Sequence, residues 1–270
     1  LCHNLEDYCS NSGEIIDIVE DLRENIWIQS FQGLYKYDKK HKTIRFYSST
    51  TYFTPNYMCV TQQGDLWISG NNGNLYNYQY GKDDFNCFPI LTTKEKEEYS
   101  GRFILADAGK YGLLIGTEEK GLKLFNPNTL SSIEILRNDN NEKPIYIRSI
   151  LPYSEDEYWI GSESGIHILN MKDGGLTSLQ KDLRSPYSLN NNAVYTLTKD
   201  REEGVWAGTY FKGVNYLPPE TTPFEKHFYQ GHDSDIKGSI IREIKQDDRG
   251  NLWIGTEDEG INMYDILSKK

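Results

Sequence analysis

Six pairs of residues in this sequence have side chains that could bind a ligand. The members of a pair lie 15 or 16 residues apart and match in chemistry: apolar, amide, ion pair, ion pair, aromatic and ion pair. Because antiparallel strands keep the sum of two paired residue numbers constant, this spacing predicts cross-strand neighbours. The pairs are Ile16 with Phe31, Asn56 with Asn71, Arg102 with Glu118, Arg148 with Glu163, Tyr195 with Tyr210, and Arg242 with Glu257.

The aromatic and amide residues of this set suit carbohydrate binding. Sugar rings stack on aromatic faces and hydrogen-bond to amides. The alternative is that these are packing and turn residues, since turns commonly contain Asn. The residues predicted to bind a ligand on this basis are Tyr195, Tyr210, Phe211, Asn56, Asn71, Asn72 and Phe31.

Three arginines, Arg102, Arg148 and Arg242, complete the predicted site residues. Each is predicted to face a glutamate, and matched opposite charges commonly stabilise a sheet. The other interpretation is an anion site for the uronate or sulfate groups of a glycan. The sequence favours the structural interpretation and leaves the second open.

Signatures of catalysis and of metal binding are missing from the sequence. It contains no G-x-S-x-G, H-E-x-x-H, P-loop or G-x-G-x-x-G motif, and its five histidines have no ligand spacing. Acidic turns resemble calcium loops in composition only. We therefore predict no catalytic residue, no metal, no cofactor and no enzyme, although a pair of carboxylates from different repeats could still act as acid and base.

A repeated sequence unit indicates which β-strands must position these residues. A strand written LWIGT in its last copy occurs in six copies, and its anchor positions are separated by 40, 47, 45, 47 and 47 residues. This is the length of one four-stranded propeller blade. We predict an all-β fold, a single β-propeller domain over residues 1–270 with six units, or part of a seven-bladed propeller. The anchors are Trp27, Trp67, Leu114, Trp159, Trp206 and Trp253.

The last unit illustrates the predicted strands. Residues Ile241–Gln246, Leu252–Thr256 and 261–266 form three of them, and the chain then ends without a fourth. Asn4–Tyr8 could complete this blade; the alternative is that the array continues beyond the sequence. The anchor tryptophan is expected to pack against the neighbouring blade, so that Trp253→Ala would cost ~3–5 kcal/mol.

Fourth strands in earlier units are short aromatic segments. In each inner hairpin the first strand leaves one face of the propeller and the second returns to it, so the six pairs should ring the mouth of the central channel. The loops 210–213 and 257–260 share this face, and we place ligand binding there. The fourth strands are predicted at residues 44–47, 85–88 and 224–229.

Charge and cysteine content exclude some classes of partner. The net charge of −11 argues against nucleic acid and against an anionic membrane surface. No apolar run is long enough to span a membrane, and no charged-then-apolar leader opens the chain, so any export signal is expected to have been removed or to lie outside the sequence. The four cysteines form no metal motif and are predicted to be free, partly buried thiols: Cys2, Cys9, Cys59 and Cys87.

The units resemble the two-component regulator propeller repeats of Bacteroides-type hybrid two-component sensors. The pattern D-x-x-G-x-L-W-I-G-T-x-x-x-G-[IL]-x-x-[YF]-D is clearest in Asp247–Asp265 and is supported by Ser188–Leu217. In that family a periplasmic sensor holds two seven-bladed propellers and a β-sandwich, followed by a membrane span, a histidine kinase and a DNA-binding regulator. This sequence departs in having six units and none of the later domains, and two copies are weakened at Leu114 and at Gln29-Ser30.

The resemblance implies a periplasmic sensor module, part of an inner-membrane receptor, that binds an oligosaccharide and signals to a kinase outside this chain. Its implied partners are the second propeller and the β-sandwich, with a homodimer of the full-length protein as a further option, and without nucleic acid or membrane contact. Two alternatives stay open. A scaffold propeller would show a large apolar patch and no small-molecule response, whereas a polysaccharide-active enzyme would turn over a glycan.

Overall fold

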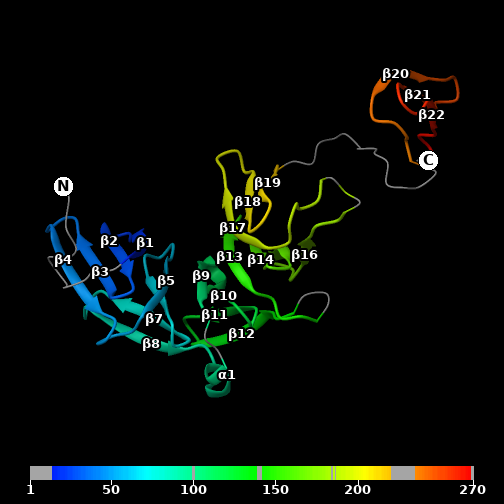
Figure 1. Ribbon diagram of the computed structural model, residues 1–270. Helices are drawn as coiled ribbons and strands as arrows, with labels where there is room; N and C mark the ends of the chain where they lie inside the picture. Colours follow the sequence, from blue (N-terminus) through cyan, green and yellow to red (C-terminus); the bar gives the residue numbers. More distant parts are fainter. Residues whose placement is uncertain are drawn as a thin grey trace. The chain divides into compact units, whose positions relative to one another are not determined.

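The computed structural model describes residues 14–98, 101–138, 142–183, 185, 187–219 and 235–268. The chain divides into two compact units (Figure 1), and each is described here by itself. The first unit comprises Leu1–Lys181 and Leu189–Leu217, and the second comprises Asp182–Ser188 and Pro218–Lys270. The prediction of one domain over residues 1–270 therefore stays a prediction.

Antiparallel sheets of three or four strands make up both units, and the fold class is an all-β propeller, as the repeat predicts. In the first unit we number the sheets blade 1 to blade 5 in chain order. Their strands are β1 (Ile15–Glu20), β2 (Asn25–Ser30), β3 (Gly33–Asp38) and β4 (Thr43–Ser48) in blade 1; β5 (Pro55–Val60), β6 (Leu66–Gly70), β7 (Asn74–Gln79) and β8 (Asp84–Pro89) in blade 2; β9 (Phe103–Asp107), β10 (Leu113–Thr117), β11 (Leu122–Asn126) and β12 (Ser131–Leu136) in blade 3; β13 (Ile147–Pro152), β14 (Glu157–Ser162), β15 (Gly165–Asn170) and β16 (Leu176–Leu179) in blade 4; and β17 (Val194–Lys199), β18 (Val205–Thr209) and β19 (Gly213–Leu217) in blade 5.

The second unit contains one described sheet, blade 6, of strands β20 (Ile241–Gln246), β21 (Leu252–Thr256) and β22 (Ile261–Tyr264). The predicted fourth strands at residues 44–47 and 85–88 are confirmed as parts of β4 and β8. Those predicted at residues 4–8 and 224–229 lie outside the described residues, as do Cys2 and Cys9. Of the other cysteines, Cys59 is half-buried and Cys87 is exposed. The helical elements described are α1 (Thr93–Glu98) and the short 3₁₀ turn Gly109–Tyr111.

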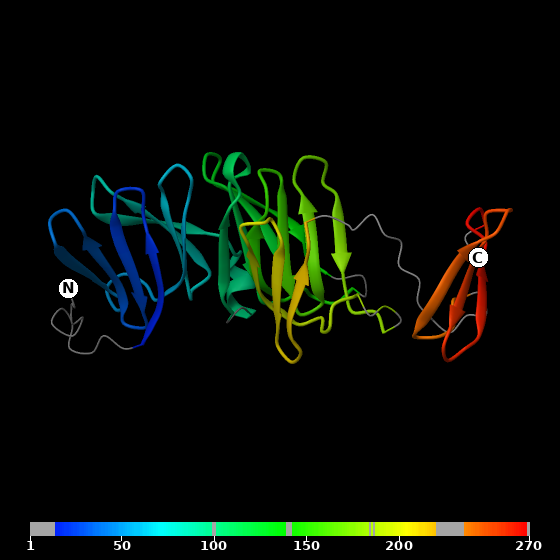
Figure 2. The same ribbon diagram turned by 90° about the horizontal axis from the view of Figure 1, so that it is seen from above.

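The first strands of the five blades in the first unit contact one another in the order β1, β5, β9, β13 and β17 (Figure 2). Hydrophobic clusters fill the space between successive blades. Trp27 on β2 is 0% exposed and meets the ring of Tyr78 on β7 at 4.6 Å between centroids. Trp67 meets Phe125 of the next blade at 5.6 Å. For these anchors the predicted packing against the neighbouring blade is confirmed.

The last two anchors are much more exposed than Trp27 and Trp67. Trp206 is 43% exposed and contacts Tyr216 of its own blade at 4.7 Å. Trp253 is 44% exposed. The second unit, as far as it is described, therefore does not supply the burial on which the expected 3–5 kcal/mol for Trp253→Ala depends, because large-to-small costs scale with burial.

The first Asp of the repeat motif caps a turn and holds the anchor tryptophan. In blade 1, Asp21 accepts hydrogen bonds from the backbone N–H groups of Arg23 and Asn25, both at 2.9 Å, and from the indole of Trp27 at 2.8 Å. The same arrangement recurs at Asp200 with Trp206 and at Asp247 with Trp253. The repeated Asp is thus a structural residue, because a carboxylate at a turn satisfies backbone donors that the sheet leaves free.

The carboxylate of Asp247, which is the repeated Asp of blade 6, is expected to make the stability of the second unit depend on pH. The hydrogen bond from the Trp253 indole is the largest cause that lowers the pKa of Asp247 to about 2, whereas an unfolded Asp has a pKa of about 3.9. Because the folded pKa is the lower one, the stabilisation is present above about pH 4 and is lost as the pH falls through about 2. Urea unfolding of the wild type and of Asp247→Asn should show a stability difference at pH 5 that disappears by about pH 2. A difference that stays constant over this range would contradict the assignment.

Candidate ligand-binding site

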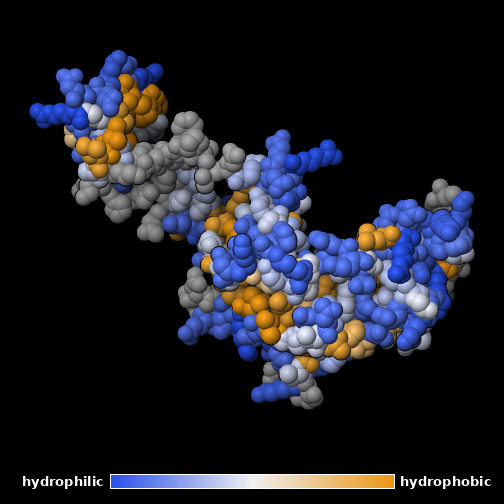
Figure 3. Space-filling model, turned by 180° about the vertical axis from the view of Figure 1, so that it is seen from behind, coloured by the Kyte–Doolittle hydropathy of each residue, from blue (hydrophilic) through white to orange (hydrophobic). Residues whose placement is uncertain are grey.

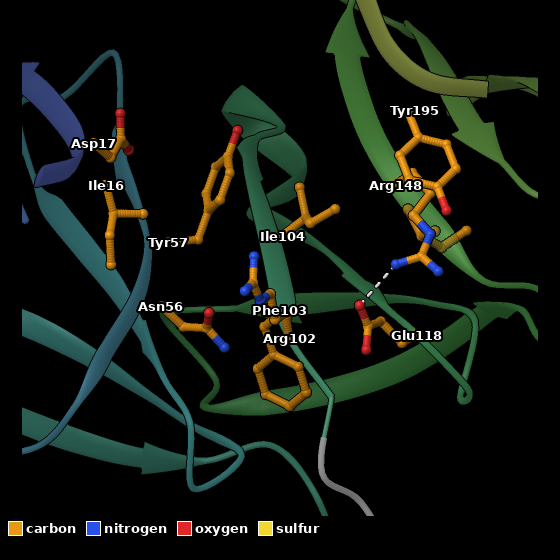
Figure 4. Close-up of a pocket in the computed structure, with 11 residues that line it drawn as sticks. Ile16, Asp17, Asn56, Tyr57, Arg102, Phe103, Ile104, Glu118, Arg148 and Tyr195 are labelled. Atoms are coloured by element: carbon orange, nitrogen blue, oxygen red, sulfur yellow. Dashed lines mark hydrogen bonds and ion pairs between the residues drawn. The ribbon is translucent and has the colours of Figure 1, made fainter. Parts of the chain in front are cut away.

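A cavity of about 390 Å³ opens among the first strands of the first unit (Figure 4). All five blades of that unit contribute to its wall. The lining residues are Ile16, Asp17, Asn56, Tyr57, Arg102, Phe103, Ile104, Glu118, Ile147, Arg148 and Tyr195. The structure therefore brings together Asn56, Arg102, Arg148 and Tyr195, which the sequence singles out, around the predicted mouth.

β-bulges place four of these side chains. The register of the first strand shifts between Ile15 and Asp17, Pro55 and Tyr57, Ile147 and Ser149, and Val194 and Thr196. The residue skipped in each blade is Ile16, Asn56, Arg148 or Tyr195, and all four line the cavity. A bulge inserts one extra residue and re-aims its side chain. In blade 3, Arg102 instead precedes β9, whose pairing with β10 is regular.

The predicted backbone register is therefore wrong at the mouth in the bulged blades, whereas the regular ladder of blade 3, which ends with Phe103 opposite Thr117, agrees with the predicted pairing of Arg102 with Glu118. The amide of Glu163 bonds to the carbonyl of Tyr146 at 3.2 Å, and the amide of Tyr210 bonds to the carbonyl of Ala193 at 2.9 Å. Each predicted partner is thus displaced by two residues. The constant-sum rule assumes an unbroken ladder, and the bulge breaks it.

Three of the predicted pairs nevertheless meet through their side chains. The rings of Tyr195 and Tyr210 lie 5.0 Å apart between centroids. Arg148 forms an ion pair with Glu163. In the second unit, Arg242 forms an ion pair with Glu257. These contacts agree with the structural interpretation of Arg148 and Arg242.

Arg148 connects two blades of the first unit. Its Nη1 donates to Oε1 of Glu118 in blade 3 at 2.8 Å (Figure 4, dashed line), and its Nε donates to Oε1 of Glu163 in blade 4 at 3.1 Å. Its guanidinium lies over the ring of Tyr195, 5.0 Å from the centroid. Burial acts to lower the pKa of Arg148, but the hydrogen bond to Glu163 and the nearby carboxylate charges outweigh it and raise that pKa. The sequence pairs Glu118 with Arg102 and misses this contact between blades.

Two polar lining residues, Asp17 and Tyr57, were not predicted. Burial raises the pKa of Asp17, against the hydrogen bond that its carboxylate accepts from the Ile18 amide at 2.8 Å. Burial, together with the charge of Asp17, also raises the pKa of Tyr57. Both residues directly follow a bulge, so a bulge recognised in the sequence would have been the signal for them.

Three aromatic side chains, those of Tyr195, Tyr210 and Phe211, form an exposed surface that begins at the cavity wall and is called the aromatic ledge. Tyr195 is 38% exposed, Tyr210 is 60% exposed and Phe211 is 73% exposed. The rings of Tyr210 and Phe211 meet edge to face at 4.4 Å between centroids. Exposed, mutually supported rings are suited to stacking against the apolar face of a ligand.

The remaining predicted residues are placed differently. Asn72 donates to the Tyr76 hydroxyl at 2.7 Å and accepts from the Asn74 amide at 3.2 Å, which are contacts of a turn residue. Asn71 and Phe31 lie in the corresponding loops and are not among the lining residues. Arg242 belongs to the second unit. Ligand binding by these four residues stays a prediction, as it does for the other predicted residues.

Two further features are absent from the described residues. Within the described ranges, no group of three or more His, Cys, Asp and Glu side chains is placed to hold a metal ion. Nor does that part of the chain include a helix whose length and apolar character would allow it to cross a membrane.

The model of the family described as "Two component regulator propeller" matches residues 188–211 and 235–258. These two segments span β17 with β18 and β20 with β21. Two segments of the chain are therefore similar to two-component regulator propeller repeats. Both matched segments contain the turn in which an Asp accepts a hydrogen bond from the anchor indole, at Asp200 and at Asp247. The comparison with curated protein sequences gave no significant match.

Solved structures share the fold of these regulator repeats. The extracellular domain named for the hybrid two-component system BT3049 from B. thetaiotaomicron matches with a TM-score of 0.63 and 22% identity, over 94% of this chain and 33% of that one. A second such domain, named for BT4673, gives 0.64 and 18%, over 95% and 40%. Virginiamycin B lyase from Staphylococcus aureus gives 0.58 and 12%, over 95% and 85%. The chain thus spans a third to two fifths of these two extracellular domains.

Proposed function

We propose that this chain is an extracytoplasmic sensor module of a hybrid two-component system, which binds an oligosaccharide at the cavity of the first unit. The regulator repeats and the fold shared with two extracellular receptor domains support this proposal. The histidine kinase that would receive the signal lies outside the chain. A periplasmic location, a second propeller, a β-sandwich and a homodimer of the full-length protein belong to the same proposal.

The observation that carries the proposal is the chemistry of the cavity. Its volume of about 390 Å³ falls in the range of small-molecule sites, roughly 300–1,000 Å³. Amide and phenol groups on its wall (Asn56, Tyr57 and Tyr195) can hydrogen-bond to sugar hydroxyls. The ledge of Tyr210 and Phe211 extends this surface outward, so that a chain of sugars longer than one ring would keep stacking contacts.

Signalling follows from the way in which the site is assembled. The wall residues come from five blades, and Arg148 already ties blade 3 to blade 4. A ligand that contacts several blades at once binds best to one arrangement of them. Such differential binding is what shifts a receptor between two states.

Replacing Tyr195 by alanine is expected to abolish or strongly reduce ligand-induced stabilisation. A ligand that binds only the folded form raises the unfolding midpoint by mass action, by about 2.7 kcal/mol at a hundredfold excess over Kd. The experiment is a thermal-shift screen of the wild type, Tyr195→Ala and Tyr210→Ala against neutral and acidic oligosaccharides. One oligosaccharide should raise the unfolding midpoint of the wild type but not that of either variant.

Tyr216→Ala is the matched control. Tyr216 is 44% exposed, close to the 38% of Tyr195, and lies in the same blade. It pairs with Trp206, towards the end of the sheet remote from the mouth. This variant should keep the wild-type shift. No shift of the wild type with any oligosaccharide would contradict the proposal and favour a scaffold propeller.

A further inference from the structure

The wall of the cavity carries as many carboxylates as guanidinium groups. The charged lining residues among the described ones are Asp17 and Glu118 against Arg102 and Arg148. Glu163 adds a third carboxylate through its ion pair with Arg148. The three carboxylates exceed the two guanidinium groups of Arg102 and Arg148 by one, so the groups around the cavity carry one net negative charge. The protein as a whole already has a net charge of −11.

Arg148, one of the two guanidinium groups of the wall that an acidic ligand would seek, is already engaged on three sides. Its Nη1 and Nε donate to Glu118 and Glu163, and its face covers the ring of Tyr195. A ligand carboxylate or sulfate would have to displace one of the two glutamates. The displaced carboxylate would then lie in a partly desolvated wall without its partner, which is costly.

Asp17 opposes a second anion on the other side of the cavity. Figure 4 shows Asp17 and Arg148 on opposite walls, with Tyr57 and Arg102 between them. Burial already acts against the charged form of Asp17. A further negative charge placed in the cavity would be repelled by this carboxylate in surroundings that screen charge poorly.

The uncharged groups of the wall favour uncharged ligands. The Asn56 amide and the phenols of Tyr57 and Tyr195 suit hydroxyl groups and the C–H faces of sugar rings. We propose that the cavity selects uncharged sugar residues and excludes uronates and sulfated sugars, with Glu118 and Glu163 as the residues that set this preference by neutralising Arg148. This inference rests on the proposed oligosaccharide binding.

The test uses oligosaccharides that differ only in charge. Oligogalacturonides, hyaluronan oligosaccharides and alginate oligosaccharides are each compared with the same material after its carboxyl groups are reduced to hydroxymethyl groups. Titration calorimetry at low salt, which leaves charge effects unscreened, should show a reduced form that binds the wild type at least about tenfold more tightly than its acidic parent.

Glu118→Gln tests the mechanism of the preference. Removing one carboxylate leaves Arg148 with one ionic partner, so the ratio between reduced and acidic forms should fall by about tenfold. Glu163→Gln should act in the same direction. Glu203→Gln is the control: Glu203 pairs with Lys199 at 2.8 Å, at the other end of β17, and the variant makes the same change in net charge. It should keep the wild-type ratio.

The outcomes separate the inference from the proposed function. An acidic parent that binds the wild type as tightly as its reduced form, or more tightly, would overturn the inference and leave oligosaccharide binding standing. An unchanged ratio in Glu118→Gln, or an equal change in Glu203→Gln, would also overturn it. If no oligosaccharide of either kind binds, the proposed function fails and the inference fails with it.

Discussion

Replacing Trp27 by alanine is expected to lower the free energy of unfolding of the first unit by about 3–5 kcal/mol. Trp27 is 0% exposed, its ring meets Tyr78 of blade 2 at 4.6 Å, and its indole donates to Asp21 at 2.8 Å. Alanine would leave a cavity between two blades and an Asp21 carboxylate without its indole donor. Equilibrium urea unfolding, followed by circular dichroism, measures the loss.

Trp206→Ala is the matched comparison for this prediction. Trp206 occupies the same repeat position and makes the same indole hydrogen bond, to Asp200 at 2.8 Å, but it is 43% exposed. Because the indole hydrogen bond is the same in both, the difference between the two losses of unfolding free energy measures the contribution of burial. Trp206→Ala should cost only about 1–2 kcal/mol. Equal losses for the two variants would contradict the exposure of Trp206 and show that its face is covered in solution.

Gly121→Ala is expected to destabilise the first unit by about 3 kcal/mol or more. Gly121 ends the turn between β10 and β11 with φ of +67°, a left-handed conformation that glycine adopts at the lowest cost. A Cβ built there lies 1.9 Å from the carbonyl oxygen of Leu136 and 2.7 Å from Cα of Arg137. Both are backbone atoms, so β12 would have to move away from β11. Urea unfolding of the purified variant gives the size of the effect.

Gly213→Ala separates the clash from the strain. Gly213 closes the equivalent turn of blade 5 with φ of +79°, and a Cβ built there meets no atom within 4 Å. Its cost should be only that of a left-handed alanine, about 1 kcal/mol. A Gly121→Ala variant no less stable than Gly213→Ala would show that β12 yields freely at this position.

The sequence predicts the blades well because each one is a local object. The spacing of the anchors, the turn glycines and the alternation within strands are properties of segments shorter than 50 residues, and the structure confirms the strands that they predict within the described ranges. The repeat also locates the mouth residues Asn56, Arg148 and Tyr195, because equivalent positions of a repeat adopt equivalent positions in the fold.

The sequence fails where the ladder breaks. A bulge at the start of the first strand leaves no mark in an alternation of apolar and polar residues, so the predicted pairing of Arg148 with Glu163 is wrong for the backbone, although their side chains meet. Asp17 and Tyr57 are missed for the same reason. Their place in the wall depends on the extra residue before them.

By itself, the sequence determined the all-β propeller class, the length of each blade and which residues of the copies differ at the mouth. Only the tertiary structure decided which guanidinium meets which carboxylates, since Glu118 and Arg148 belong to different blades. Burial was decided in the same way: Trp27 and Trp206 stand in the same motif, yet one is enclosed and the other exposed. The physical reason is that hydrogen bonds within a blade are local, whereas burial and ion pairing between blades depend on neighbours that are distant in the chain.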